Sequence, residues 1–255
     1  MATTGRVAGK SAFIRIGDWF FKYRNLAFPA VLVALMIVFP PVPLLGDPAR
    51  DWLLDLVGVT LCVIGSGLRI WVIGLAYIKR GGLNKKVHAD SLVTDGMFGV
   101  CRNPLYVGNA LVLAGILLVH GSPWVIGLGA LYFGFAYAAI VAAEEHFLRA
   151  KFGAEYDAYC RTVNRFWPDF ARYRAARRDM VFNWRRPLMK DYSSVYAWIA
   201  ALLVQRAYER VDWGLLQATL PDLAPTLSAL AVATAAMVLV RALKKSGLLT
   251  ELPQG

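Results

Sequence analysis

The sequence predicts an all-α fold, a polytopic bundle of about six transmembrane helices. The chain of 255 residues is 58% hydrophobic, which is more than an ordinary soluble domain carries. It contains several apolar runs of about 20 residues, the length that crosses the hydrocarbon core of a bilayer. The net charge of +11 suits either nucleic acid or an anionic membrane face. Because the chain is so apolar, the positive charge is better explained by an anionic membrane face, and we expect no nucleic-acid partner.

Four apolar runs are clear candidates for membrane spans, and they cover residues 26–45, 51–78, 104–120 and 123–143. The second run is long enough to tilt in the bilayer. A very short turn, the dipeptide Gly-Ser before Pro123, separates the third run from the fourth. We therefore predict that these two runs form a helical hairpin.

Two weaker candidates follow at 193–209 and 223–240. Gln205 and Arg206 interrupt the first, which could instead be an interfacial helix. With six spans, nearly all of the 28 lysines and arginines fall on one side of the membrane. The positive-inside rule makes that side cytoplasmic, with both termini there, in an inner or plasma membrane. If 193–209 did not cross, the basic C-terminal residues would change sides.

This layout divides the chain into three parts. Residues 1–25 form a basic cytoplasmic segment, 26–168 the membrane core, and 169–255 a basic juxtamembrane segment with two further helices. Within the last part, residues 171–190 mix arginines with Trp and Phe. Such a stretch suits anionic lipid at the membrane surface, or an anionic substrate head group. The three cysteines have no metal-like spacing, so no metal site is predicted.

The polar residues that border the third and fourth runs form the candidate site. CRNPLYVGN begins at Cys101 and introduces the third run, and Glu144 and Glu145 end the fourth. A hairpin would bring both stretches to one membrane surface. Pro104 suits the first turn of a helix, whose free N–H groups favour an anion. Together with an arginine and the carboxylates, they would suit a zwitterionic ligand. A solvated helix end is the alternative interpretation of the glutamates.

Arg69 lies inside the second apolar run, about ten residues from its cytoplasmic end. A charge at that depth is costly and marks a functional site by default. An ion pair with Glu145 would accommodate it, and snorkelling towards the surface is the alternative. The nearby GSG at 65–67 predicts close packing between helices.

Three stretches carry a family resemblance: GLRIWVIGLAYI, SLVTDGMFGVCRNPLYVGN and EEHFLRAKFGAEYDAYCRTVNRFWP. In this order, over about residues 58–168, they resemble the superfamily of isoprenylcysteine carboxyl methyltransferases and phospholipid methyltransferases. The resemblance implies an integral membrane enzyme that uses S-adenosylmethionine at a cytoplasmic site. The acceptor would be lipid-like: a prenylated cysteine carboxylate, a phospholipid amine or a small isoprenoid. It predicts nothing about the oligomeric state.

The resemblance also assigns residues by position. It implies a cofactor slot with these residues: Leu92, Val93, Phe98, Arg102, Asn103, Pro104, Leu105, Tyr106 and Glu144. Glu145, Arg69 and Arg165 are the candidate catalytic residues. Two positions depart from the family pattern, because Asn103 replaces its His and Phe98 replaces its usual Tyr. An Asn cannot titrate near neutral pH, so a mechanism that needs a protonatable ring there would not operate in this chain.

Two other functions are alternatives to methyl transfer. An NADPH-dependent membrane reductase of the sterol-reductase type also carries a Tyr-rich stretch that ends in Pro, like YDAYCRTVNRFWP. The LVT-x-G segment and the RNPLY motif argue against it. The third possibility is a non-catalytic relative, and the replacement of the family His by Asn103 would be consistent with lost activity. The methyltransferase is favoured, because displacement at a sulfonium methyl needs chiefly positioning and a dry slot.

Overall fold

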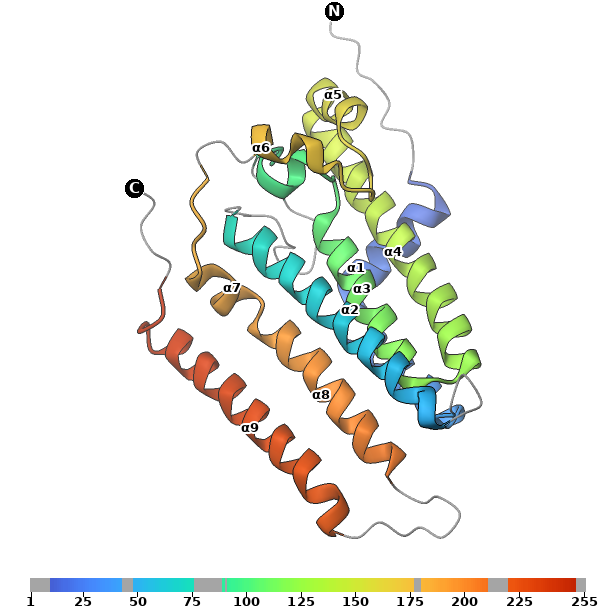
Figure 1. Cartoon of the computed structure of the whole chain (residues 1–255). Helices are drawn as coiled ribbons and strands as arrows, with labels where there is room; N and C mark the ends of the chain where they lie inside the picture. Colours follow the sequence, from blue (N-terminus) through green and yellow to red (C-terminus); the bar gives the residue numbers. More distant parts are fainter. Residues whose placement is uncertain are drawn as a thin grey trace, which may run out of the picture. The chain divides into compact units, whose positions relative to one another are not determined.

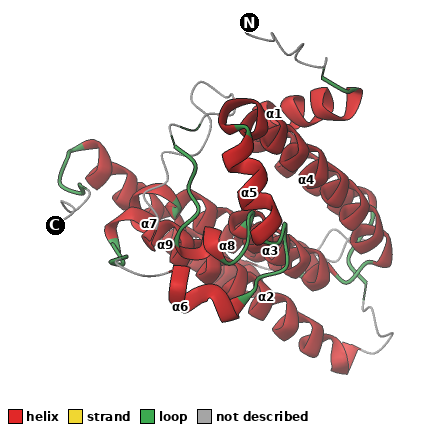
Figure 2. Ribbon diagram, turned by 90° about the horizontal axis from the view of Figure 1, so that it is seen from above, coloured by secondary structure: helices red, strands yellow, loops and turns green. Residues whose placement is uncertain are grey.

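The computed structural model describes residues 10–42, 48–75, 89, 91–176, 180–210 and 220–250. Within these ranges the regular structure is entirely helical (Figure 2). The longer helices are α1 (Ala12–Val38), α2 (Pro48–Leu75), α3 (Pro104–His120), α4 (Pro123–Phe152), α5 (Ala154–Thr162), α8 (Tyr192–Glu209) and α9 (Leu220–Lys245). Short elements are η1 (Gly96–Gly99), η2 (Phe170–Arg172), α6 (Tyr173–Ala176) and α7 (Arg185–Lys190). The predicted all-α membrane fold is confirmed.

Four of the described helices are long and apolar enough to cross a membrane: Ala12–Val38, Trp52–Leu75, Pro123–Phe152 and Leu223–Lys245. Helix α3 is apolar but shorter, and α8 is not among the four. The first helix begins earlier than the predicted 26–45. Ser11 marks its start, because the hydroxyl accepts a hydrogen bond from the N–H of Ile14 at 3.3 Å. It ends just before Pro40 and Pro41, which cannot continue a helix.

The chain divides into two compact units. The first comprises residues 1–38, 78–103 and 127–178. The second comprises residues 39–77, 104–126 and 179–255. The boundary falls between Asn103 and Pro104, so the RNPLY motif contributes to both units. Helix α4 starts in the second unit and continues into the first.

In the first unit, α1 packs on α4 through aromatic rings and one glycine. Phe28 lies edge-on to Phe133, with 5.2 Å between the ring centroids, and Phe20 lies edge-on to Tyr132 at 5.8 Å. A Cβ added to Gly17 would lie 2.0 Å from the carbonyl oxygen of Ala139. Only glycine therefore permits this approach. The aromatic residues explain why the helix starts at Ala12, since apolar positions already recur among the basic ones there.

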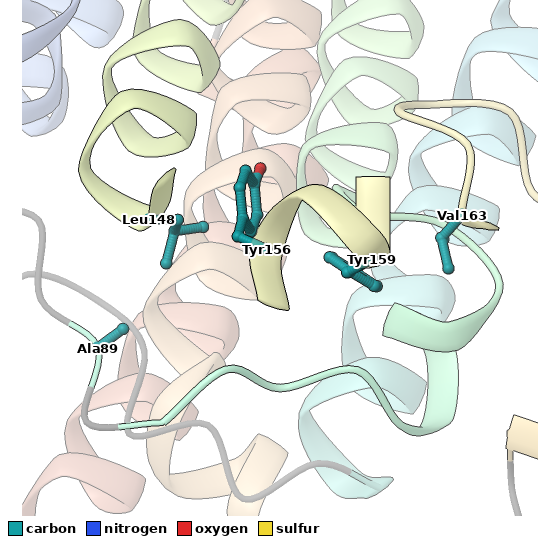
Figure 3. Close-up of a cluster of buried hydrophobic side chains, with 5 residues drawn as sticks. All are labelled: Ala89, Leu148, Tyr156, Tyr159 and Val163. Carbon is teal, nitrogen blue, oxygen red and sulfur yellow. The ribbon is translucent and has the colours of Figure 1, made fainter. Parts of the chain in front are cut away.

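The end of α4 carries α5 on a small apolar core. Gly153, with φ of 52°, separates the two helices. The core consists of Ala89, Leu148, Tyr156, Tyr159 and Val163. Figure 3 shows Tyr156 of α5 beside Leu148 of α4. At the exposed surface, Arg149 donates to Asp157 at 2.8 Å and ties the helices once more.

In the second unit, α2 and α3 approach closely through glycines. A Cβ on Gly65 would lie 2.5 Å from the oxygen of Gly108, and one on Gly115 would lie 2.3 Å from the oxygen of Gly58. The predicted close packing at GSG is thus confirmed for Gly65. A Cβ on Gly67 would meet nothing within 4 Å.

The C-terminal helices of the second unit run beside one another (Figure 1). Helix α8 is antiparallel to α9, because Tyr196 near the start of α8 bonds Thr234 at 3.1 Å and the Lys244 ammonium lies over the Tyr192 ring at 5.6 Å. Helix α8 is also antiparallel to α2. Its start contacts Arg69, and its end brings Arg206 within 3.7 Å of Asp55.

Candidate active site

Residues 100–103 lie beside residues 164–169 in the first unit, although more than 60 positions separate them in the sequence. The backbone N–H of Arg102 donates to the carbonyl of Asn164 at 2.9 Å. The N–H of Asp169 donates to the carbonyl of Val100 at 3.0 Å. These bonds hold the start of the RNPLY motif against the NRFWP stretch. The pairing gives a physical reason for both motifs to occur in one chain.

Two buried side chains reinforce this pairing. The Asn103 amide donates from Nδ2 to the carbonyl of Arg165 at 3.0 Å, and the side chain is buried. The thiol of Cys101 donates to the carbonyl of Phe166 at 3.3 Å. Burial raises the pKa of the Cys101 thiol, so it remains a protonated donor at neutral pH. Asn103 therefore serves as a neutral donor that fixes the backbone of Arg165.

The charged centre of the site is formed by Glu145, Arg165 and Arg102. Arg165 forms a bidentate ion pair with Glu145, with Nε 3.0 Å from Oε1 and Nη2 3.0 Å from Oε2. Arg102 approaches the same carboxylate more loosely, with Nη2 3.6 Å from Oε1. The Arg102 and Glu145 side chains are each about 15% exposed or less. This bidentate geometry is the strong form of an arginine–carboxylate pair.

A hydrogen bond from a side chain of α5 holds the 3-10 turn η1 in place. The hydroxyl of Tyr159 donates to the carbonyl of Phe98 at 2.7 Å, and both side chains are buried. Gly99 lies against Ala176, because a Cβ added to Gly99 would lie 2.6 Å from the Cβ of Ala176. Nearby, burial and the charge of Glu145 raise the pKa of Tyr156, so the phenol stays neutral. The turn is thereby fixed next to the charged centre.

The other predicted cofactor residues lie in different surroundings. Leu92 packs on the apolar core of α5, whereas Val93 and Glu144 are half-buried. Pro104, Leu105 and Tyr106 form the first turn of α3, as predicted, and belong to the second unit. The structure therefore brings together Arg102, Asn103, Glu145 and Arg165 of the predicted set. Phe98 lies in η1, a few residues earlier in the chain.

Arg69 does not have the partner that we expected. In the second unit it pairs with Asp191, from Nη2 to Oδ1 and from Nε to Oδ2, the latter at 3.1 Å. It also donates to Asn109, and to Ser194 at 3.1 Å. The proposed pair with Glu145 is thus corrected, because Asp191 supplies the counter-charge. Sequence reasoning missed Asp191, although it stands where the basic segment meets the next apolar run.

The charged centre is suited to binding and positioning a ligand. Among the described residues there is no group of three or more His, Cys, Asp or Glu side chains that could hold a metal ion. The centre offers a fixed carboxylate, two guanidiniums and a neutral amide. Such a set can orient a charged ligand and hold it out of water.

Comparisons with known proteins match one family model and several relatives. The family model of phospholipid methyltransferases matches residues 54–155. The chain is 32% identical to the nickel-cobalt-cadmium resistance protein NccN of Alcaligenes xylosoxydans xylosoxydans over 161 residues, which are 63% of this chain and 68% of that protein. It is 24% identical to protein-S-isoprenylcysteine O-methyltransferase B of Arabidopsis thaliana over 138 residues, 52% of this chain and 69% of that protein.

A further relative is matched over a shorter part. The cobalt-zinc-cadmium resistance protein CzcN of Cupriavidus metallidurans is 35% identical over 121 residues, 48% of this chain and 50% of that protein. The chain thus spans half the length of this relative. No solved structure matches the chain. Arg165 and Asp191 both lie beyond the residues that the family model covers.

Proposed function

Since the chain belongs to the superfamily of phospholipid methyltransferases and isoprenylcysteine carboxyl methyltransferases, we propose that it methylates a lipid-like acceptor with S-adenosylmethionine as donor. We further propose that the reaction takes place at the cytoplasmic face of the membrane. The observation that carries the proposal is the backbone pairing of the RNPLY motif with NRFWP. It places Arg102 and Asn103 beside the Glu145–Arg165 pair within one compact unit.

The residues fit the amino-acid part of this cofactor. The Nε of Arg102 is buried and has no hydrogen-bond partner within the described residues. An unpaired buried guanidinium N–H suits a carboxylate. Glu144, half-buried one position before Glu145, is the group that we assign to the cofactor ammonium. Within the first unit, Leu92, Val93 and Phe98 would supply apolar lining. The assignment of Pro104, Leu105 and Tyr106 to the cofactor stays a prediction.

When bound, the cofactor supplies an electrophilic methyl group on a sulfonium. The residues of this chain would bind it, orient it and exclude water, because such a displacement needs alignment more than a protein nucleophile. Asn103 holds the backbone of Arg165, and Arg165 holds Glu145. The predicted catalytic role of Arg69 stays a prediction. Its bonds to Asp191 favour a positioning role for this guanidinium.

The test is isothermal titration of the detergent-purified full chain with S-adenosylhomocysteine and, separately, with NADPH. We expect micromolar binding of the first, lost or weakened about tenfold or more in Arg102→Gln and in Glu144→Gln, since each removes a charge-assisted bond. The matched control is Arg161→Gln, because Arg161 is an exposed arginine of α5. Binding of NADPH alone would favour the reductase, and binding of neither ligand would favour a non-catalytic relative.

A further inference from the structure

An exposed aromatic surface lies next to the charged centre in the first unit. It consists of Phe166, Trp167 and Phe170, which are 37%, 84% and 67% exposed. We propose that this aromatic surface inserts among the anionic lipids of the cytoplasmic leaflet and anchors the first unit there. It precedes residues 171–190, the stretch that the sequence alone associated with anionic lipid. The inference does not rest on the methyl transfer proposed above.

The first observation is that the backbone beneath the aromatic surface is fixed. Asn164 and Asp169 form backbone hydrogen bonds with residues 100–103. The Asp169 carboxylate also accepts a hydrogen bond from the N–H of Ala171 at 3.2 Å, so the turn η2 that carries Phe170 is capped. The fold therefore holds the rings at the surface. Large aromatic side chains that are fixed in an exposed position mark an interaction site.

The second observation is the positive charge around the rings. Between positions 165 and 174 the chain carries three arginines, Arg165, Arg172 and Arg174, and one acidic residue, Asp169. The Arg165 guanidinium lies over the Phe166 ring, 5.4 Å from its centroid. Basic side chains near an anionic leaflet are attracted to its head groups, and aromatic rings with polar neighbours suit the same interface. The charge thus favours anionic lipid over an apolar protein partner.

The third observation is the depth of the aromatic surface. Arg165, the residue before Phe166, forms the bidentate pair with Glu145. Glu145 follows the apolar run 123–143 by two positions, and the helix α4 that contains both is long and apolar enough to cross a membrane. The pair therefore lies where the apolar part of this helix ends, which is the level of the lipid head groups. Trp167, two positions after Arg165, is within reach of the same level.

Site-specific photocrosslinking tests the proposal. The photoreactive residue benzoylphenylalanine replaces the exposed Trp167 in the full chain, which is reconstituted in vesicles of phosphatidylcholine and phosphatidylglycerol. Illumination should give lipid adducts in which phosphatidylglycerol exceeds its share of the vesicle. In Arg172→Gln this enrichment should fall by up to about fivefold, because one basic group near the anionic surface is lost. Glu155, exposed on α5 beyond the last turn of α4, is the matched control position and should give few lipid adducts.

Three outcomes would overturn the proposal. Lipid adducts that are no more abundant at position 167 than at position 155 would place the aromatic surface outside the membrane. Adducts to a second copy of the chain, in place of lipid, would identify a protein-docking surface. Equal capture of the two lipids in proportion to their content would show that the arginines do not select anionic lipid. The same crosslinker at Phe170, a second exposed position of the surface, should reproduce the result obtained at Trp167.

Discussion

At the scale of the residue, Asn103 replaces the family histidine and still makes a buried hydrogen bond. Its amide bonds the carbonyl of Arg165 in a buried setting next to Arg102. We predict that Asn103→His folds at pH 8, because a neutral imidazole can also donate. Below the ordinary pKa of histidine, protonation would place a third cation beside two arginines. The pKa of the new imidazole should therefore be depressed in the folded state.

The sign of this effect fixes the measurement. A depressed pKa means that the unfolded chain binds more protons, so stability is lost as the pH falls through the ordinary histidine range. The melting temperature of Asn103→His should drop further below that of the unmodified chain at pH 5.5 than at pH 8. Asn103→Gln, which cannot titrate, is the control and should show the same difference at both pH values. A constant difference for the histidine variant would place the side chain outside the cationic cluster.

Cysteine reactivity tests the burial of the paired stretches. Cys62 and Cys101 are fully buried, whereas Cys160 is partly exposed. Burial also raises the pKa of Cys101, which lowers the thiolate fraction that reacts. We predict that N-ethylmaleimide modifies Cys160 first in the folded protein, as read by mass spectrometry. Denatured protein should be modified at all three cysteines, and rapid labelling of Cys101 in the folded chain would contradict the pairing of residues 100–103 with 164–169.

Much of the charged centre was predictable at this scale. Arg102, Asn103, Glu145 and Arg165 stand in recognisable motifs, and the structure joins them. Their bonds were not predictable, because both charges and amides have many possible partners. The assignment of Glu145 to Arg69 failed for this reason. Asp191 lies outside every motif and becomes the partner of Arg69 only through the folding of α8 along α2.

At the scale of the element, the contact between α2 and α3 depends on glycines that the helix period alone does not distinguish. A Cβ on Gly65 would collide with the backbone oxygen of Gly108, while one on Gly67 meets nothing. We predict that Gly65→Ala lowers the unfolding free energy by about 1–3 kcal/mol, since backbone must move. Gly67→Ala should be neutral or stabilise by up to about 1 kcal/mol through helix propensity. Thermal unfolding in detergent compares them, and equal effects would exclude the close approach.

The bond between α2 and the start of α8 gives a second test at this scale. Asp191 is 1% exposed, and removing one partner of a buried ion pair leaves an uncompensated charge. We predict that Asp191→Asn destabilises the chain by about 3–5 kcal/mol. Adding Arg69→Gln should recover part of this loss, because the unpaired charge is removed as well. A strictly additive double variant would show that the two side chains do not interact.

Helix boundaries were the weakest part of the sequence prediction at this scale. The first span was placed at 26–45, but the helix runs from Ala12 to Val38. Because Arg15, Lys22 and Arg24 are charged, this stretch did not resemble a membrane span in the sequence, although Phe20 and Phe21 give it an apolar face. Arginine and lysine can lie along an apolar helix with their charges directed to water, and the Arg24 guanidinium indeed lies over the Phe21 ring at 4.2 Å.

At the scale of the whole molecule, the open question is whether α8 crosses the membrane. Its composition is ambiguous, with Gln205 and Arg206 near its end, but its contacts favour a crossing. Arg69 and Asp55 of α2 contact its two ends, and along a helix these two residues are about 20 Å apart. That distance is about two thirds of a hydrocarbon core. Both α2 and its other neighbour, α9, are long and apolar enough to span.

A helix that packs lengthwise along two membrane-spanning helices must cross the membrane with them. An interfacial helix would instead lie in the membrane plane, roughly perpendicular to the two spans. We therefore predict that the segment before α8 and the residues after α9 lie on one side of the membrane. Single cysteines at the exposed positions Val181 and Ser246, in a chain whose three native cysteines are replaced, should react with an impermeant maleimide only when the cytoplasmic face is accessible. Labelling of the two positions from opposite faces would place α8 at the interface. The basic residues after α9 would then lie outside, against the charge distribution that predicted six spans.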